Sequence, residues 1–220
     1  MKVTYYLEVT SSWCFWSEPV CTELKRRYEG RVEFQWKIAK MQPGDWPVSR
    51  EQCDWFFRRS GTIVRSPFML NSGWFEPLRP GTYPAASYVA EAAKDLGFTG
   101  DEIRLALANA AVLQGQKVGR MAIAVAIAAR AGGKKIDAKK LLATAESADI
   151  AARIEASTRE FFTHQINQRP AFILEYEIGD NAVFSGLVKI KPLAATIDAM
   201  LSDAEAYASY KAHFGGPPAS

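Results

Sequence analysis

The sequence has only three cysteines, two histidines and no long hydrophobic run. Cys14, Cys21 and Cys53 are too few for a disulfide framework and lack the spacing of a metal site. Cys14 and Cys21 fall on one predicted helix, roughly 10 Å apart along its axis, which excludes a disulfide between them. The longest apolar run, residues 121–129, is about half as long as a bilayer span. We therefore expect no metal and no membrane partner.

Signals for export and for nucleic-acid binding are also lacking. A strand pattern follows Lys2 at once, without the apolar region and cleavage site of a secretory signal, so we expect a cytoplasmic protein. The net charge of +3 includes no basic block, which argues against a nucleic-acid partner. With 220 residues, 48% hydrophobic and 23% charged, the chain can bury a sizeable core as one domain or as a domain with an insertion.

The first 40 residues predict a strand, a helix and a second strand. The apolar run 3–9 is typical of a buried strand, and apolar residues alternate along 31–39. Between them we expect a helix from about Trp13 to Tyr28, with Ser11 at its start and Cys14 one turn further on. A helix N-terminus carries unpaired N–H groups that stabilise an anion and lower the pKa of a cysteine. This end of the first strand is therefore where we expect the chemistry.

Residues 41–166 combine loop and helix patterns. Pro and Gly mark residues 41–47 as a loop, and a capping box at Ser49 predicts a short helix to Arg59. Residues 61–84 carry four prolines and are expected to form either an irregular layer on the core or a lid over a substrate. Five helices are expected from residue 85 on, the third beginning at residue 117 and the fifth at residue 147.

Strand patterns return after this helical region. We expect strands at residues 171–176 and 182–184, joined by a hairpin turn. A helix from Pro192 to Leu201 and a further helix to His213 should follow. Residues 215–220 are predicted to be a disordered tail.

The order of these elements and two short motifs resemble a known family. Ser11-Ser12-Trp13-Cys14, with a proline five residues after the cysteine, resembles the C-x-x-C helix of the thioredoxin superfamily with its first cysteine replaced by serine. Residues 167–174 resemble the segment in which that superfamily places a cis-proline, here Pro170. The helical region between them resembles the insertion of the DsbA-like family, including its FrnE-like, 2-hydroxychromene-2-carboxylate isomerase and kappa-class glutathione transferase branches.

This resemblance implies an α/β thioredoxin fold, strand-helix-strand and then strand-strand-helix, with a large helical insertion. Residues 1–40 and 167–214 would form the thioredoxin-like domain, and residues 41–166 the loop and helical insertion domain. It also implies that Ser11, Cys14 and Pro170 converge, and that the peptide bond between Arg169 and Pro170 is cis.

Ser11 excludes ordinary disulfide donation by a C-x-x-C pair, because the exposed nucleophilic cysteine is missing. In the glutathione-dependent branches the matching residue is a serine, and the resemblance implies that its hydroxyl binds the thiolate of glutathione, which attacks a small electrophile. Ser12, Trp13 and the backbone of Arg169 beside Pro170 would bind the thiol. Those branches carry a Ser-Asp pair after the last strand, whereas this chain has Phe-Ser-Gly-Leu-Val at 184–188 and is more similar there to the FrnE-like members.

Each motif also has a purely structural explanation. Ser11 is a common type of helix cap, Cys14 a small buried apolar residue and Pro170 an ordinary proline at a strand start. Three functions stay open: a thiol- or glutathione-dependent isomerase or transferase, which we favour, an oxidoreductase that acts through Cys14, and a binding module without catalysis. His164 and His213 do not decide among them. The oligomeric state is open as well; related branches are often homodimers.

Overall fold

The computed structural model describes residues 1–78, 83–186 and 189–216. None of the helices in these ranges combines the length and the apolar character that crossing a membrane requires. The elements follow one another as β1 (Lys2–Leu7), α1 (Ser12–Arg27), β2 (Glu33–Ile38), α2 (Arg50–Ile63), α3 (Ala85–Lys94), α4 (Glu102–Val112), α5 (Met121–Gly132), α6 (Ala138–Ala145), α7 (Ala148–Thr163), β3 (Ala171–Glu175), β4 (Asn181–Ser185) and α8 (Ile190–Phe214).

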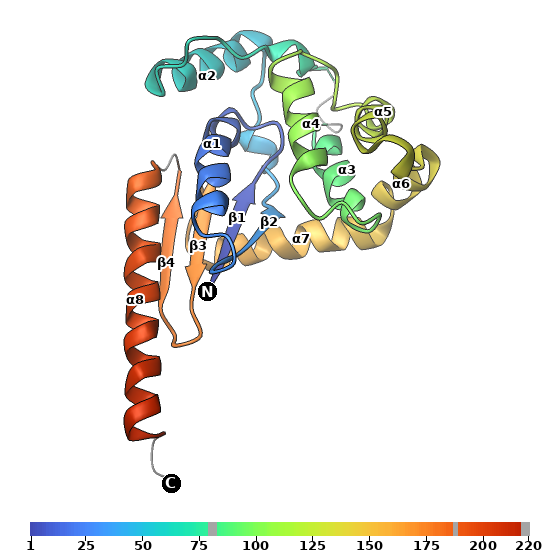
Figure 1. Ribbon diagram of the computed structural model, residues 1–220. Coiled ribbons are helices and arrows are strands. Elements are labelled where there is room, and N and C mark those ends of the chain that lie inside the picture. Colours follow the sequence, from blue (N-terminus) through green and yellow to red (C-terminus); the bar gives the residue numbers. More distant parts are fainter. Residues whose placement is uncertain (79–82, 187–188, 217–220) are drawn as a thin grey trace.

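The four strands form one mixed sheet in the order β2-β1-β3-β4. β1 pairs with β2 in parallel, and α1 supplies the crossover that a parallel pair requires. β3 is antiparallel to both β1 and β4. The sequence predicts this α/β thioredoxin topology, and helices α2 to α7 are inserted between β2 and β3 (Figure 1).

Helices cover both faces of the sheet, so β1 is buried on both sides. Successive side chains of a strand point to opposite faces. On one face, the ring of Tyr5 stacks on Phe172 with a centroid distance of 4.8 Å. There the hydroxyl of Tyr28, at the end of α1, donates a hydrogen bond of 2.9 Å to the carbonyl of Ala194 in α8. On the other face, Tyr6 packs against Phe161 of α7 at 5.6 Å.

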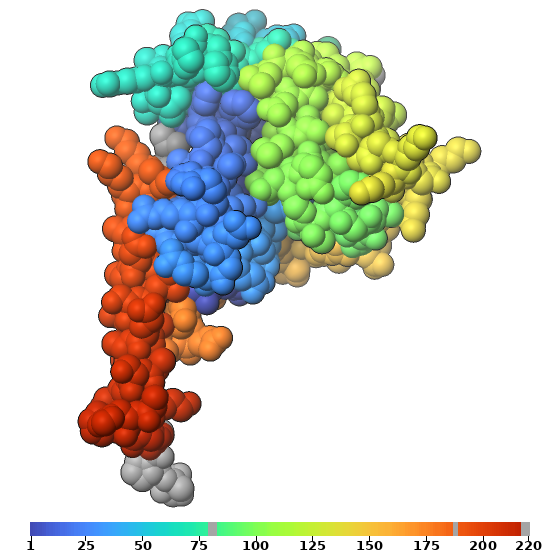
Figure 2. All heavy atoms as spheres, viewed as in Figure 1, coloured from blue at the N-terminus to red at the C-terminus, as the bar shows by residue number. Residues whose placement is uncertain are grey.

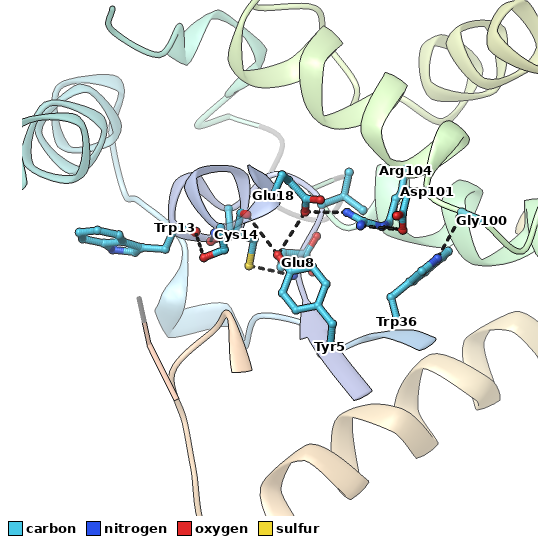
Figure 3. A network of polar contacts seen from close by, with 12 residues as sticks. Tyr5, Glu8, Trp13, Cys14, Glu18, Trp36, Gly100, Asp101 and Arg104 are labelled. Carbon is cyan, nitrogen blue, oxygen red and sulfur yellow. Dashed lines mark hydrogen bonds and ion pairs between the residues drawn. The ribbon is translucent and has the colours of Figure 1, made fainter. Parts of the chain in front are cut away.

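The helical insertion lies beyond the β2 edge of the sheet and is tied to α1 by a buried ion-pair network (Figures 1 and 3). Arg104 of α4, whose side chain is 2% exposed, lies 2.6 Å from Glu18 of α1 and 2.7 Å from Asp101. Asp101 also pairs with Lys25 of α1. The hydroxyl of Tyr5 donates to Glu18 at 3.1 Å, so the network extends to the central strand.

Three boundaries differ from the sequence prediction. α8 is one helix rather than two, because residues 201–206 contain no glycine or proline and alanines continue the helix. α2 runs beyond Arg59 to Ile63, and α5 begins at Met121 rather than Lys117, because Arg120 donates to the Lys117 carbonyl in a turn. Of the predicted tail, residues 217–220 lie outside the described residues.

Candidate active site

Ser11 is the N-cap of α1, directly after β1. Its backbone is extended (φ −73°, ψ 126°), and its hydroxyl oxygen accepts a hydrogen bond of 3.4 Å from the Cys14 N–H. A hydroxyl that accepts one hydrogen bond still has its own proton to donate. Ser11 is partly exposed and stands at the positive end of the helix. Its hydroxyl also forms a hydrogen bond with the Cys14 thiol.

A cavity of about 370 Å³ opens at this helix end. Ser11, Ser12 and Trp13 line it from one end of the chain, and Arg169 lines it from the other. The structure thus brings these predicted site residues together. Its volume falls in the usual range for small-molecule sites.

Arg169 lines this cavity directly before Pro170. Its peptide bond to Pro170 is cis, the geometry that the family resemblance implies. Its guanidinium donates a hydrogen bond of 2.6 Å to the carbonyl oxygen of Lys40 and another to the carbonyl oxygen of Ala39. The guanidinium also lies 4.9 Å from the ring centroid of Phe161. These contacts hold the side chain inside the protein.

Cys14 lies behind this wall. It is 2% exposed and is not among the residues that line the cavity. Burial raises the pKa of its thiol to about 12, although the N–H of Glu8 points at the sulfur from 3.5 Å and favours the thiolate. Desolvation therefore outweighs the hydrogen bonds from the Glu8 N–H and from Ser11. Cys14 therefore has the environment of a core side chain.

Glu8, which directly follows β1, carries a fully buried carboxyl group that was not predicted from the sequence. Burial raises its pKa to about 7, against the opposing effect of the hydrogen bond from the Ser87 hydroxyl. The available signal was a single acidic residue within the apolar run 3–9. Its N–H contacts the Cys14 sulfur, so Glu8 lies just beneath the α1 terminus (Figure 3).

The far wall of the cavity comes from the region after β2 and is aromatic. Trp46, Phe56 and Trp74 line it, together with the cation Arg59. The guanidinium of Arg59 lies 5.9 Å from the ring centroid of Trp13, and so it stands beside the α1 terminus. The sequence placed the aromatic and proline-rich stretch in the insertion, but the contact of Arg59 with Trp13 depends on the tertiary fold.

Among the described residues, no group of three or more His, Cys, Asp or Glu side chains could hold a metal ion. No family model matches the sequence, and neither does any curated protein.

Solved structures do resemble the chain. A cytosolic disulfide reductase, DsbM from Pseudomonas aeruginosa, aligns with a TM-score of 0.69 and 18% identity over 92% of this chain and 99% of its own. A putative protein disulfide isomerase from Nitrosomonas europaea aligns with a TM-score of 0.69 and 15% identity over 92% and 98%. The chain has a DsbA-like thioredoxin fold. A 2-hydroxychromene-2-carboxylate isomerase shares this DsbA-like fold with a TM-score of 0.60 and 12% identity over 94% and 99% of the two chains.

We expect Cys14 to react slowly with a thiol alkylating reagent at mildly acidic pH, because its thiol is buried and its pKa is raised to about 12. The native protein should be labelled at Cys14 no faster than at Cys21 or Cys53, which are buried too. The unfolded protein should be labelled at all three. Peptide mass spectrometry after timed labelling measures each rate. Rapid labelling of Cys14 near pH 6, with the other two inert, would instead identify it as a reactive thiol.

Proposed function

We propose that this protein is a glutathione- or thiol-dependent enzyme of the isomerase or transferase type, in which Ser11 binds the reacting sulfur. One observation carries the proposal: a serine hydroxyl, not a cysteine, stands at the α1 terminus on the cavity wall, with Cys14 buried behind it. When bound, glutathione would supply the nucleophilic thiolate. Ser11 would donate its proton to the sulfur as a hydrogen bond, and the helix N-terminus would favour the negative charge.

The other lining residues fit an extended, acidic thiol peptide and an apolar electrophile. The backbone of Arg169 can pair with an extended peptide by strand addition. Arg59 offers a cation for a peptide carboxylate, and the aromatic wall that includes Trp46 and Trp74 offers apolar surface to the second substrate. A structure of DsbM from Pseudomonas aeruginosa with GSH aligns with this chain at a TM-score of 0.67 and 17% identity, over 92% of this chain and 100% of the DsbM chain. This similarity supports glutathione as the thiol.

A second candidate function is thiol-disulfide exchange through Cys14. The disulfide reductase and disulfide isomerase names of the structural neighbours favour it. The burial of Cys14 and its raised pKa argue against it, because exchange requires an accessible thiolate. The two candidates respond oppositely to Cys14→Ala, which should preserve the first activity and abolish the second.

Glutathione is expected to raise the melting temperature of the protein, since a ligand at 100 times its dissociation constant adds about 2.7 kcal/mol to the free energy of unfolding. S-methylglutathione, which lacks the thiol, should give a smaller shift, because it cannot accept the hydrogen bond of Ser11 as a thiolate does. Differential scanning calorimetry measures both shifts. Equal shifts would remove Ser11 from the proposed role, and the absence of any shift with glutathione would contradict the proposal itself.

A further inference from the structure

The C-terminal half of α8 carries a stripe with apolar side chains that the other described residues leave exposed. Residues on one face of α8 follow a regular alternation of three and four positions, the spacing of a coiled-coil seam: Leu193, Ile197, Met200, Ala204, Tyr207, Lys211 and Phe214. The first four are buried against the body of the protein. From residue 205 to residue 214 every residue is exposed. This half of the helix extends away from the sheet and the insertion (Figures 1 and 2).

The exposed half presents large aromatic side chains. Tyr207, Tyr210 and Phe214 are 64%, 63% and 67% exposed, and the rings of Tyr210 and Phe214 stack at a centroid distance of 4.8 Å. Ten exposed helical residues extend roughly 15 Å, and a helix of that length gains little stability in water without tertiary packing. The continued seam therefore indicates a helical partner on this face.

The charges on this half of α8 favour a second copy of the same chain as the partner. Asp203 and Glu205 stand at its beginning, whereas Lys211 stands near its end. Two such helices side by side in opposite directions bring the acidic part of each against the basic part of the other, and their dipoles also oppose. A parallel pair would place like charges together.

We propose that the protein forms a homodimer through an antiparallel pair of α8 C-terminal halves. Antiparallel seams place the alternating positions of one helix opposite those of the other. Phe214 then lies opposite Ala204 of the second copy, a large side chain against a small one. Tyr207 lies opposite Lys211 of the second copy, where a cation can contact a ring. The twofold axis then passes near residue 209. This surface is independent of the proposed catalytic function.

Sedimentation equilibrium of the full chain tests the dimer. The wild type should have roughly twice the 24.4 kDa of one chain at micromolar concentration. Replacing both Tyr207 and Phe214 with serine should raise the dimer dissociation constant at least tenfold, because the apolar seam is lost. The control is Val183→Ser, which removes an exposed apolar side chain from the edge strand β4. A monomeric wild type, or a dimer that Val183→Ser weakens and the seam variant does not, would overturn the proposal.

Spin labels separate the antiparallel arrangement from a parallel one. Ala208→Cys and Ser202→Cys introduce exposed labelling sites, while the three native cysteines are buried. In the antiparallel dimer, labels at position 202 are separated by roughly 20 Å more along the helix axis than labels at position 208. A parallel dimer gives similar distances at both positions, and that result would refute the proposed arrangement. Circular dichroism of each variant verifies that it is folded.

Discussion

Replacing Ser11 with alanine is expected to lower kcat/KM of the thiol-dependent reaction by about two orders of magnitude, the usual cost of removing one donor to a developing or bound anion. Ser11 is the partly exposed hydroxyl at the α1 terminus, and Cys14 is too deeply buried to replace it. The assay follows glutathione consumption with a chromogenic aromatic electrophile. The dissociation constant of glutathione, measured by calorimetry, should rise together with the loss of activity.

A matched variant separates this role from helix capping. Ser147 caps α7 as Ser11 caps α1, with its hydroxyl accepting a hydrogen bond of 3.3 Å from the Ile150 N–H, but it does not line the cavity. Ser11→Ala and Ser147→Ala should both lose about 1 kcal/mol of stability with their caps. Only Ser11→Ala should lose thiol binding and turnover. If the two variants keep the same activity, Ser11 is a structural cap and nothing more.

Replacing Arg104 with alanine should lower the free energy of unfolding by about 3–5 kcal/mol, because it leaves Glu18 without its cation and Asp101 with Lys25 alone. The Arg104 side chain is 2% exposed, and its partners are Glu18 in α1 and Asp101 before α4. Burial disfavours the charged guanidinium, but these two acids raise the pKa of Arg104 above its ordinary value. The Arg104 guanidinium therefore stays charged, and its removal takes away a positive charge that stabilises the neighbouring carboxylates.

Urea denaturation followed by circular dichroism measures the effect. The control is Arg120→Ala. The Arg120 side chain is 43% exposed and pairs with Glu76. An ion pair with a solvent-exposed cation contributes little to stability. A loss at Arg104 no larger than the loss at Arg120 would mean that the network does not hold the insertion on α1.

Local patterns in the sequence were sufficient for several helix starts and strands, whereas the topology followed from the family resemblance. Caps depend on a few neighbouring residues, and the predicted caps at Ser11 and Ser49 both accept the expected backbone hydrogen bonds. The alternation along residues 31–39 likewise marks β2. These features need no knowledge of distant contacts.

The charged interior was beyond sequence reasoning. Glu8 and Arg104 are buried because of partners far along the chain: Ser87 contacts Glu8, and Glu18 binds Arg104 across 86 positions. No local period marks such pairs. The same limit applies to Arg59, whose position beside Trp13 depends on how the insertion folds back over α1. The sequence left open whether Cys14 is a reactive thiol or a small buried residue, and the structure places it in the core.

The pKa of glutathione in its complex with the protein tests whether Ser11 binds the reacting sulfur. Thiolate absorbance in the ultraviolet, recorded across a pH titration with saturating protein, reports the ionisation of the bound sulfur, while Cys14, Cys21 and Cys53 stay protonated because burial raises their pKa values to about 12. We expect the pKa of the glutathione thiol to be well below that of free glutathione when it is bound to the wild type. With Ser11→Ala, the pKa of the bound thiol should return toward that of free glutathione. An unchanged pKa with the wild type, or an equal decrease with Ser11→Ala, would contradict this role of Ser11.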